Sequence, residues 1–297
     1  MTAPASPQTE TLHSEATGLD LHADTEILSQ LLHAQQAALT AMTSALSEIS
    51  SASELLIKSM RKNGCIHYVA AGSSALMGLA DGAEIPGTFG LAADRIAIHM
   101  AGGVPTNGNM PGHTEDDDSA ALAAAQSVQQ QDVVIAISAS GSTPYPLCFA
   151  QAARERGAAI ISIANNADAP LFALADVAIH LNTPPELIAG STRLGAATAQ
   201  KVALNMMSTL VGIRLGHVFD GMMVNLVADN EKLRARALRI VTRITGASDA
   251  SAKDCLQKAN GAVKPATLLA AGATSLQHAQ ELIEQTNGDL RAAMRHL

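Results

Sequence analysis

The stretch ELIAGSTRLGAATAQKVALNMMSTLVGIRLGHVFDGMMVNLVADNE, residues 186–231, decides the fold. It opens with a turn at Gly190-Ser191-Thr192 and continues for more than twenty residues without proline. Its apolar residues recur at helical spacing, at Ala199, Val202, Ala203, Met206, Leu210, Ile213 and Leu215. We expect a long helix whose first turn is capped by Ser191 or Thr192, packed on two sides by the rest of the chain.

The composition restricts the class of protein. Apolar residues make up 47% of the 297 residues but aromatic residues only 2%, so the core is predicted to be aliphatic. The net charge of −8 argues against general binding to nucleic acid, which requires basic surfaces. Three widely spaced cysteines give neither a disulfide framework nor a zinc site. No signal peptide and no membrane-length apolar run is found, so we expect a cytoplasmic protein without membrane partners.

Apolar runs upstream of residue 186 predict a sheet. They lie at Ile66–Ala71, Arg95–Ala101, Val133–Ala139, Ala159–Ala164 and Val177–Leu181, and most are separated by helical patterns. Continuous apolar strands that alternate with helices are typical of a parallel sheet covered on both faces. The sequence therefore predicts an α/β fold of three layers (αβα) with a five-stranded parallel sheet.

Segments outside this sheet complete the predicted organisation. Residues 1–20 are rich in Ser, Thr, Pro and Glu and are predicted to be a mobile tail. A helical pattern from Asp24 to the Asn63-Gly64 stop signal predicts two helices. We expect the main domain to span residues 21–246 and a small helical subdomain to span residues 247–297. Ser248 and Ser275 are candidate N-caps of helices in this subdomain.

Two polar loops follow predicted strands, at the edge where parallel sheets bind ligands. Their hydroxyl residues are Ser73 and Ser74 after the first strand, and Ser138, Ser140, Ser142 and Thr143 after the third. Neither loop matches a dinucleotide or nucleoside-triphosphate motif. Hydroxyl and amide donors at a helix start suit a single phosphate group on a sugar, whereas ordinary helix capping is the alternative interpretation.

Several motifs resemble those of one enzyme family. The segment that begins Gly190-Ser191-Thr192-Arg193 reads G-S-T-R-x-x-A-x-T-A-Q-K-x-x-L-N-M-x-S-T, and Asn230-Glu231-Lys232-Leu233 extends the match. These residues are similar to the signature of the N-acetylmuramic acid 6-phosphate etherases, in the SIS (sugar isomerase) superfamily. The match runs from about Thr9 to the C-terminus. It implies a SIS domain with a helical C-terminal subdomain, and a homodimer.

The resemblance also implies catalytic residues. In Asp81-Gly82-Ala83-Glu84 and Gly112-His113-Thr114-Glu115, the two family glutamates fall on Glu84 and Glu115. From the residues alone, either would be an ordinary solvated carboxylate. By resemblance, Glu84 is the acid that protonates the departing ether oxygen, and Glu115 is the base that removes the C2 proton. The reaction requires no cofactor, and no histidine pattern predicts a metal site.

Some family positions differ. Leu76, Ser142 and Gly195 replace family cations, and Gly112 replaces a glutamate, whereas Ser191, Arg193 and Lys201 are retained as binding candidates. The leading expectation is an etherase that releases lactate from N-acetylmuramic acid 6-phosphate in cell-wall recycling. The alternatives are a non-catalytic sugar-phosphate-binding regulator and an aldose–ketose sugar-phosphate isomerase.

Overall fold

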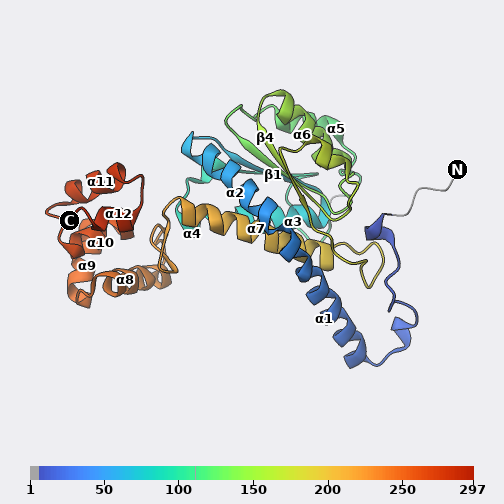
Figure 1. The fold of residues 1–297 in the computed structure, drawn as a ribbon, viewed down its shortest axis with the longest axis horizontal. Helices are drawn as coiled ribbons and strands as arrows, with labels where there is room; N and C mark the ends of the chain where they lie inside the picture. The colour runs from blue at the N-terminus through green and yellow to red at the C-terminus, as the bar shows by residue number, and fades with distance from the viewer. Residues whose placement is uncertain (1–6, 111) are drawn as a thin grey trace. The chain divides into compact units, whose positions relative to one another are not determined.

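The computed structural model describes residues 7–110 and 112–297 (Figure 1). The chain divides into two compact units. The first comprises Met1–Gly82 and Asp94–Met207, and the second comprises Ala83–Ala93 and Ser208–Leu297. The division passes through helix α7 (Gly195–Arg214), whereas the sequence placed a boundary at residue 246. No helix among the described residues has the length and apolarity needed to span a membrane.

A five-stranded parallel sheet forms the centre of the first unit, which confirms the predicted fold class. Its strands are β1 (Ile66–Ala70), β2 (Ile96–Met100), β3 (Val133–Ile137), β4 (Ala159–Ala164) and β5 (Val177–His180). Their order is β2-β1-β3-β4-β5, and β1 pairs directly with β3. The strand order reverses between these two strands, so their carboxyl ends form the switch point where ligands bind in such sheets.

Helices cover both faces of the sheet (Figure 1). On one face, α5 (Asp118–Ala125) and α6 (Pro144–Glu155) bury Ala125 and Phe149 against Val69 and Val134. On the other face, α3 (Gly72–Gly82) contacts Tyr68 and Ile137 through Gly78, and α2 (Leu46–Arg61) contacts β1, β3 and β5. The layers follow from the strands, which are apolar on both sides and need cover on both.

The N-terminal segment is folded where the structure describes it. It contains η1 (Gln8–Glu10), η2 (Leu19–Leu21), α1 (Asp24–Thr40) and η3 (Ala41–Ala45), followed by α2. Thr9 and Leu19 are buried. The amide of Thr9 donates to Oδ1 of Asn166, which follows β4 at the edge of the sheet. Thr9 and Leu19 within the expected mobile tail are therefore packed, whereas most residues between them are exposed. Residues 1–6 lie outside the described residues.

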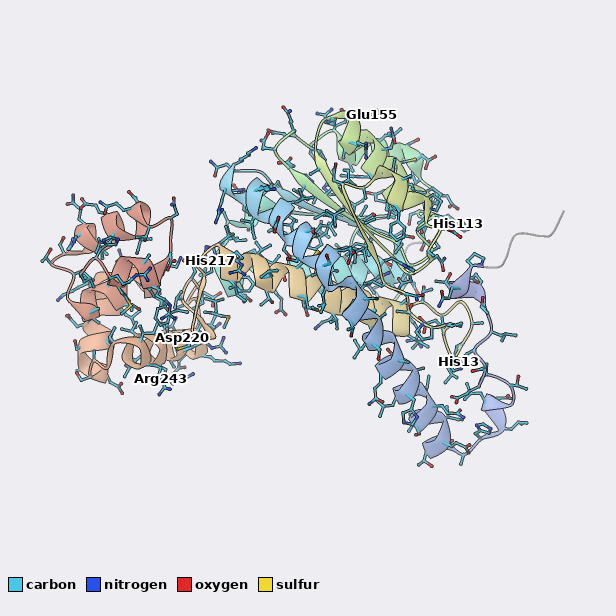
Figure 2. All side chains as sticks on the ribbon, in the orientation of Figure 1. His13, His113, Glu155, His217, Asp220 and Arg243 are labelled. Atoms are coloured by element: carbon cyan, nitrogen blue, oxygen red, sulfur yellow. The ribbon has the colours of Figure 1, made fainter. Side chains whose placement is uncertain are left out.

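The second unit is mainly helical. It contains α4 (Ile85–Phe89) and the hairpin β6 (Val218–Phe219) and β7 (Met222–Met223), whose turn carries Asp220 (Figure 2). The helices α8 (Glu231–Thr245), α9 (Asp249–Lys258), α10 (Val263–Ala271), α11 (Leu276–Gln285) and α12 (Leu290–Met294) follow. The remaining short 3-10 helices are η4 (Ala93–Arg95) and η5 (Pro170–Leu174).

An internal repeat accounts for the α9–α12 region. In both halves, a serine caps a ten-residue helix and an Asn-Gly pair in the left-handed region ends it. The pairs are Ser248 with Asn260-Gly261 and Ser275 with Asn287-Gly288. Capping at Ser248 and Ser275 was predicted from the sequence, whereas the repeat was not.

A histidine pair, in which His67 is buried and His99 half-buried, lies on the α5–α6 side of the sheet. Nδ1 of His67 and Nε2 of His99 are 2.9 Å apart, and His67 Nε2 lies 3.2 Å from Oδ2 of the buried Asp132. The ring of His99 packs against Phe149. Burial lowers the pKa of His67, and burial together with a charge on His67 lowers the pKa of His99 to about 4.

The pair makes stability depend on pH. The unfolded histidines bind protons near pH 6.5 and the folded ones only at lower pH, so the free energy of unfolding falls as the pH drops from 6.5 towards 4. We expect His99→Gln to reduce this acid-dependent loss by about 1–2 kcal/mol, measured by urea denaturation between pH 7 and 4.5. The exposed His296→Gln is the control. Equal pH dependence in both variants would contradict the assignment.

Candidate functional site

The two hydroxyl loops meet at the switch point between β1 and β3. Ser74 is buried and Ser73 half-buried in the first turn of α3, and Ser138 is buried directly after β3. The sequence placed these loops at one edge of the sheet, and the direct pairing of β1 with β3 makes them neighbours. Among the described residues, the amides of Gly72, Ser73 and Ser74 donate to no protein acceptor, so they are available to an anion.

The loop after β3 is a cluster of hydroxyl groups. The Oγ of Ser138 lies 2.8 Å from Oγ1 of Thr143 and 3.2 Å from Oγ of Ser140, and Ser142 Oγ donates to Ser140 Oγ at 3.1 Å. Thr143 precedes α6 but its side chain makes no capping bond. Helix capping by Thr143 therefore does not account for the cluster, whose hydroxyl groups are potential donors to an anion.

The first turn of α6 offers few donors to an anion, contrary to the expectation that helix amides contribute there. Pro144 and Pro146 have no N–H, and the amide of Tyr145 donates to the carbonyl of Glu115 at 2.9 Å. The hydroxyl groups of this loop are therefore the donors left for an anion, together with the first turn of α3.

Glu115 lies beside the first turn of α3. A Cβ on Gly72 would lie 2.8 Å from Oε1 of Glu115, and Gly72 adopts a φ of 54°, which glycine tolerates best. The side chain of Glu115 is exposed, and its loop, marked by His113 in Figure 2, is joined to α6 through Tyr145. A negative charge is favoured at a helix N-terminus. Glu115 is thus an accessible carboxylate at the switch point.

Glu84 belongs to the second unit. It is the exposed residue immediately before α4, and its carbonyl accepts from the amide of Thr88 at 3.0 Å. At the other end of α4, the carbonyl of Phe89 accepts from Nδ2 of Asn225 at 2.8 Å. Glu84 and Glu115 therefore lie on separate compact units.

Asp81, three residues before Glu84, joins three elements of the first unit. This buried carboxylate accepts from the Tyr68 hydroxyl on β1 at 2.7 Å and from Asn205 Nδ2 on α7 at 2.6 Å. Burial and the charge of Asp81 raise the pKa of Tyr68, so its hydroxyl remains a donor. The network fixes α3, whose first turn carries Ser73 and Ser74. Asp81 lies in the sequence motif that contains Glu84, but no local pattern in the sequence predicted that Tyr68 and Asn205 would be its hydrogen-bond partners.

The remaining candidates lie near the start of α7. Ser191 is half-buried, and Arg193 and Lys201 are exposed, so both cations are open to a ligand. The expected cap by Ser191 or Thr192 is wrong. The buried carboxylate of Glu186 accepts instead from the amides of Gly195 and Ala196, both at 2.8 Å. An anionic ligand therefore finds this helix N-terminus already occupied.

No group of three or more His, Cys, Asp or Glu side chains in the described part of the chain is arranged to hold a metal ion.

Comparisons with known proteins identify the family. The SIS domain model matches residues 92–211. The chain is 38% identical over 294 residues to the N-acetylmuramic acid 6-phosphate etherase of Mycolicibacterium smegmatis, covering 97% of both chains. It is 36% identical to the etherase of Deinococcus radiodurans, covering 97% of this chain and 95% of that one.

The chain belongs to the N-acetylmuramic acid 6-phosphate etherase family. A structural comparison agrees on the fold. A protein of Escherichia coli CFT073, solved in complex with A5P, has a TM-score of 0.51 and 16% sequence identity, covering 67% of this chain and 97% of that chain. At this identity the likeness concerns the fold alone.

Gly195 explains one departure from the etherase pattern. A Cβ at this position would lie 3.0 Å from Cβ of Ala38 on α1 and 3.1 Å from Oε2 of Glu186. Thr198 on α7 also donates to Oε1 of Gln35 on α1 at 2.7 Å. Because α1 packs closely against the start of α7, the lysine found here in the family pattern would require Ala38 and Glu186 to move by a few tenths of an ångström.

Restoring that lysine is therefore expected to destabilise this etherase relative. We expect Gly195→Lys to lower the free energy of unfolding by about 1–3 kcal/mol, the usual cost of overpacking, in chemical denaturation. Thr209→Lys, at an exposed position of the same helix, adds the same side chain without this contact. Equal free energies of unfolding for the two variants would contradict this expectation, because they would show that α1 moves to accommodate the lysine.

Proposed function

We propose that this protein cleaves the D-lactyl ether of N-acetylmuramic acid 6-phosphate to N-acetylglucosamine 6-phosphate and D-lactate. It would act as a carbon–oxygen lyase in the cytoplasmic recycling of cell-wall sugars. The similarity to etherases over nearly the whole chain supports this proposal. The observation that carries it is the accessible carboxylate of Glu115 at Gly72, where the β1 and β3 loops meet.

The reaction divides into two proton transfers and a hydration. In the open aldehyde form of the sugar, Glu115 takes the C2 proton, and the electron pair forms the C2–C3 double bond as the C3–O bond breaks. Glu84 gives a proton to the departing oxygen, which therefore becomes the hydroxyl group of the released lactate. Water then adds to the unsaturated aldehyde. Both roles rest on the family resemblance, and the chemistry needs neither a cofactor nor a metal ion.

The phosphate group is assigned to the switch point. Support comes from the free amides of the α3 first turn and from the hydroxyl cluster, which together provide donors to several phosphate oxygens. These residues are Ser73, Ser74, Ser138, Ser140, Ser142 and Thr143. Arg193 and Lys201 remain for the lactyl carboxylate or the phosphate, and Ser191 for a sugar hydroxyl.

One observation favours a second function, that of a sugar-phosphate-binding regulator. Leu76, Ser142 and Gly195 stand where the family pattern has cations, and a charge-assisted contact is about twice as strong as a neutral one. A protein that lacks these contacts would bind a sugar phosphate without holding it in the geometry that turnover requires.

Lactate release from N-acetylmuramic acid 6-phosphate by the purified protein tests the proposal directly. We expect the wild type to release lactate and the variants Glu84→Ala and Glu115→Ala to release none. Binding of the sugar phosphate in calorimetry without lactate release would support the regulator. Interconversion of an aldose and a ketose phosphate without lactate release would support an isomerase.

The protein is further proposed to be a homodimer. Support comes from leucines that are exposed along the N-terminal segment, including Leu21 at 83%, Leu28 at 64% and Leu32 at 57% exposure. Leu28 and Leu32 are four residues apart on α1 and so lie on one face of that helix. Exposed apolar faces of this kind are typical of interfaces between subunits.

Charges on this face are expected to separate the subunits. Leu28→Glu combined with Leu32→Glu should give a monomer in sedimentation equilibrium at micromolar concentration, because burying two carboxylates opposes association. The double variant Ser29→Glu, His33→Glu places the same charges on neighbouring exposed positions of α1 and should remain a dimer. A dimer in both cases would place the interface elsewhere.

A further inference from the structure

The N-terminal segment Gln8–Glu10, here called the strap, is attached to the edge of the sheet that carries the site. Thr9 is only 5% exposed. Its amide donates to Oδ1 of Asn166 at 3.2 Å, its Oγ1 accepts from Nδ2 of Asn166 at 3.2 Å, and its carbonyl accepts from the amide of Gly190 at 3.2 Å. Every polar group of Thr9 thus has a partner, so the strap is held in a defined position.

Asn166 connects the strap to the hydroxyl cluster. Its Nδ2 also donates to the carbonyl of Ser140 at 3.2 Å, so one amide group holds both Thr9 and the loop after β3. Asn166 is 9% exposed and follows β4. A single side chain therefore links the loop that carries Ser140 to Thr9.

The strap is also tied to the end of β5 and to α7. Nε2 of Gln8 donates to the carbonyl of Thr183 at 2.7 Å. Thr183 Oγ1 accepts from Nδ2 of the buried Asn165 at 3.1 Å, and Asn165 Oδ1 accepts from Nε2 of Gln200 at 2.9 Å. These residues form a polar network beneath the strap, from the carboxyl ends of β4 and β5 to α7.

Glu10 places a carboxylate at the turn before α7. A Cβ on Gly190 would lie 3.2 Å from Oε2 of Glu10, and Gly190 has a φ of 74°. The side chain of Glu10 is exposed and takes part in no ion pair with another described residue. The same turn carries Ser191 and Arg193. The carboxylate of Glu10 accepts hydrogen bonds from O–H and N–H groups.

We propose that the strap is part of the substrate site. Glu10 accepts a hydrogen bond from a hydroxyl or the acetamido N–H of the sugar, and Asn166 couples docking of the strap to binding of phosphate by the hydroxyl loop. The strap then selects for the uncharged face of a sugar phosphate, while the two loops hold its anionic end. This inference rests on the proposed sugar-phosphate function.

Matched variants test the two parts of the strap. With N-acetylmuramic acid 6-phosphate, Glu10→Gln is expected to raise KM about tenfold or more, the effect of losing a hydrogen bond to a charged group, with a smaller change in kcat. Glu15→Gln, an exposed glutamate of the same segment, is the control. Thr9→Val removes the acceptor for Asn166 and should also raise KM. Thr11→Val should not, because the Thr11 hydroxyl donates to the carbonyl of Pro7 and to no other described residue.

Hydrogen exchange gives a readout that does not depend on turnover. N-acetylglucosamine 6-phosphate should slow amide exchange at residues 9–11 in the wild type and in Thr11→Val, and less so in Thr9→Val. Thermal melting of each variant shows whether the fold is intact, and Glu10→Gln retains every hydrogen bond of Gln8 and Thr9 that anchors the strap. Slower exchange in a protein that releases no lactate would support the strap and overturn the etherase proposal alone.

Two results would overturn the strap proposal. A wild type that releases lactate, together with KM values and exchange rates equal in all four variants, would refute the strap and leave the etherase function intact. A wild type that neither releases lactate nor binds N-acetylglucosamine 6-phosphate would refute both proposals.

Discussion

Glu115→Gln is expected to lower kcat for lactate release by about 10²–10⁴-fold, the usual contribution of general acid–base catalysis. The substitution preserves the size of the side chain beside Gly72 but removes the base that takes the C2 proton. In D2O, the wild type should also exchange the C2 hydrogen of unreacted substrate or product for deuterium, and Glu115→Gln should not. Both measurements follow the same proton.

Asp116→Asn is the matched control for Glu115→Gln, because Asp116 is the exposed neighbouring carboxylate. It should retain lactate release and deuterium exchange. If Glu115→Gln and Asp116→Asn had equal kcat, Glu115 would have no part in the proton transfer, and the position of its carboxylate at the first turn of α3 would need another explanation.

Glu84→Gln should have an effect of similar size on lactate release but a different effect on exchange. Without the acid, the ether oxygen departs unprotonated, and release falls by about 10²–10⁴-fold. Glu115 still removes the C2 proton, so deuterium continues to enter at C2. The combination of lost release and retained exchange distinguishes an acid from a base.

Glu54→Gln, an exposed glutamate on α2, is the control for Glu84→Gln. If Glu84→Gln abolished deuterium exchange as completely as Glu115→Gln, the two carboxylates would act on the same proton and the assigned roles would be wrong. Full retention of both activities would remove Glu84 from the mechanism.

Local patterns predicted much of the fold. Five apolar runs predicted the five strands, because a strand covered on both faces carries few polar residues. The start and stop signals around α9 and α11 gave Ser248 and Ser275 as caps, because a cap bonds to amides two or three residues away. The hydroxyl loops were found for the same reason, since each follows its strand directly.

The cap of α7 could not be predicted in this way. Glu186 lies nine residues before Gly195, outside the window in which capping rules apply, and the intervening turn folds back to bring its carboxylate to the helix. The strap was missed for a related reason. Its composition resembles a disordered tail, but Thr9 finds its partners at Asn166 and Gly190, far along the chain.

The sequence by itself determined the strands, the long helix, the hydroxyl groups and the two family glutamates, because these depend on residue type and on spacing along a few turns of chain. The tertiary structure decided that β1 lies beside β3, that Glu115 rests against Gly72, and that α1 fills the space beyond Gly195. Those features depend on contacts between segments distant in sequence, where close packing leaves room for one side chain and excludes another.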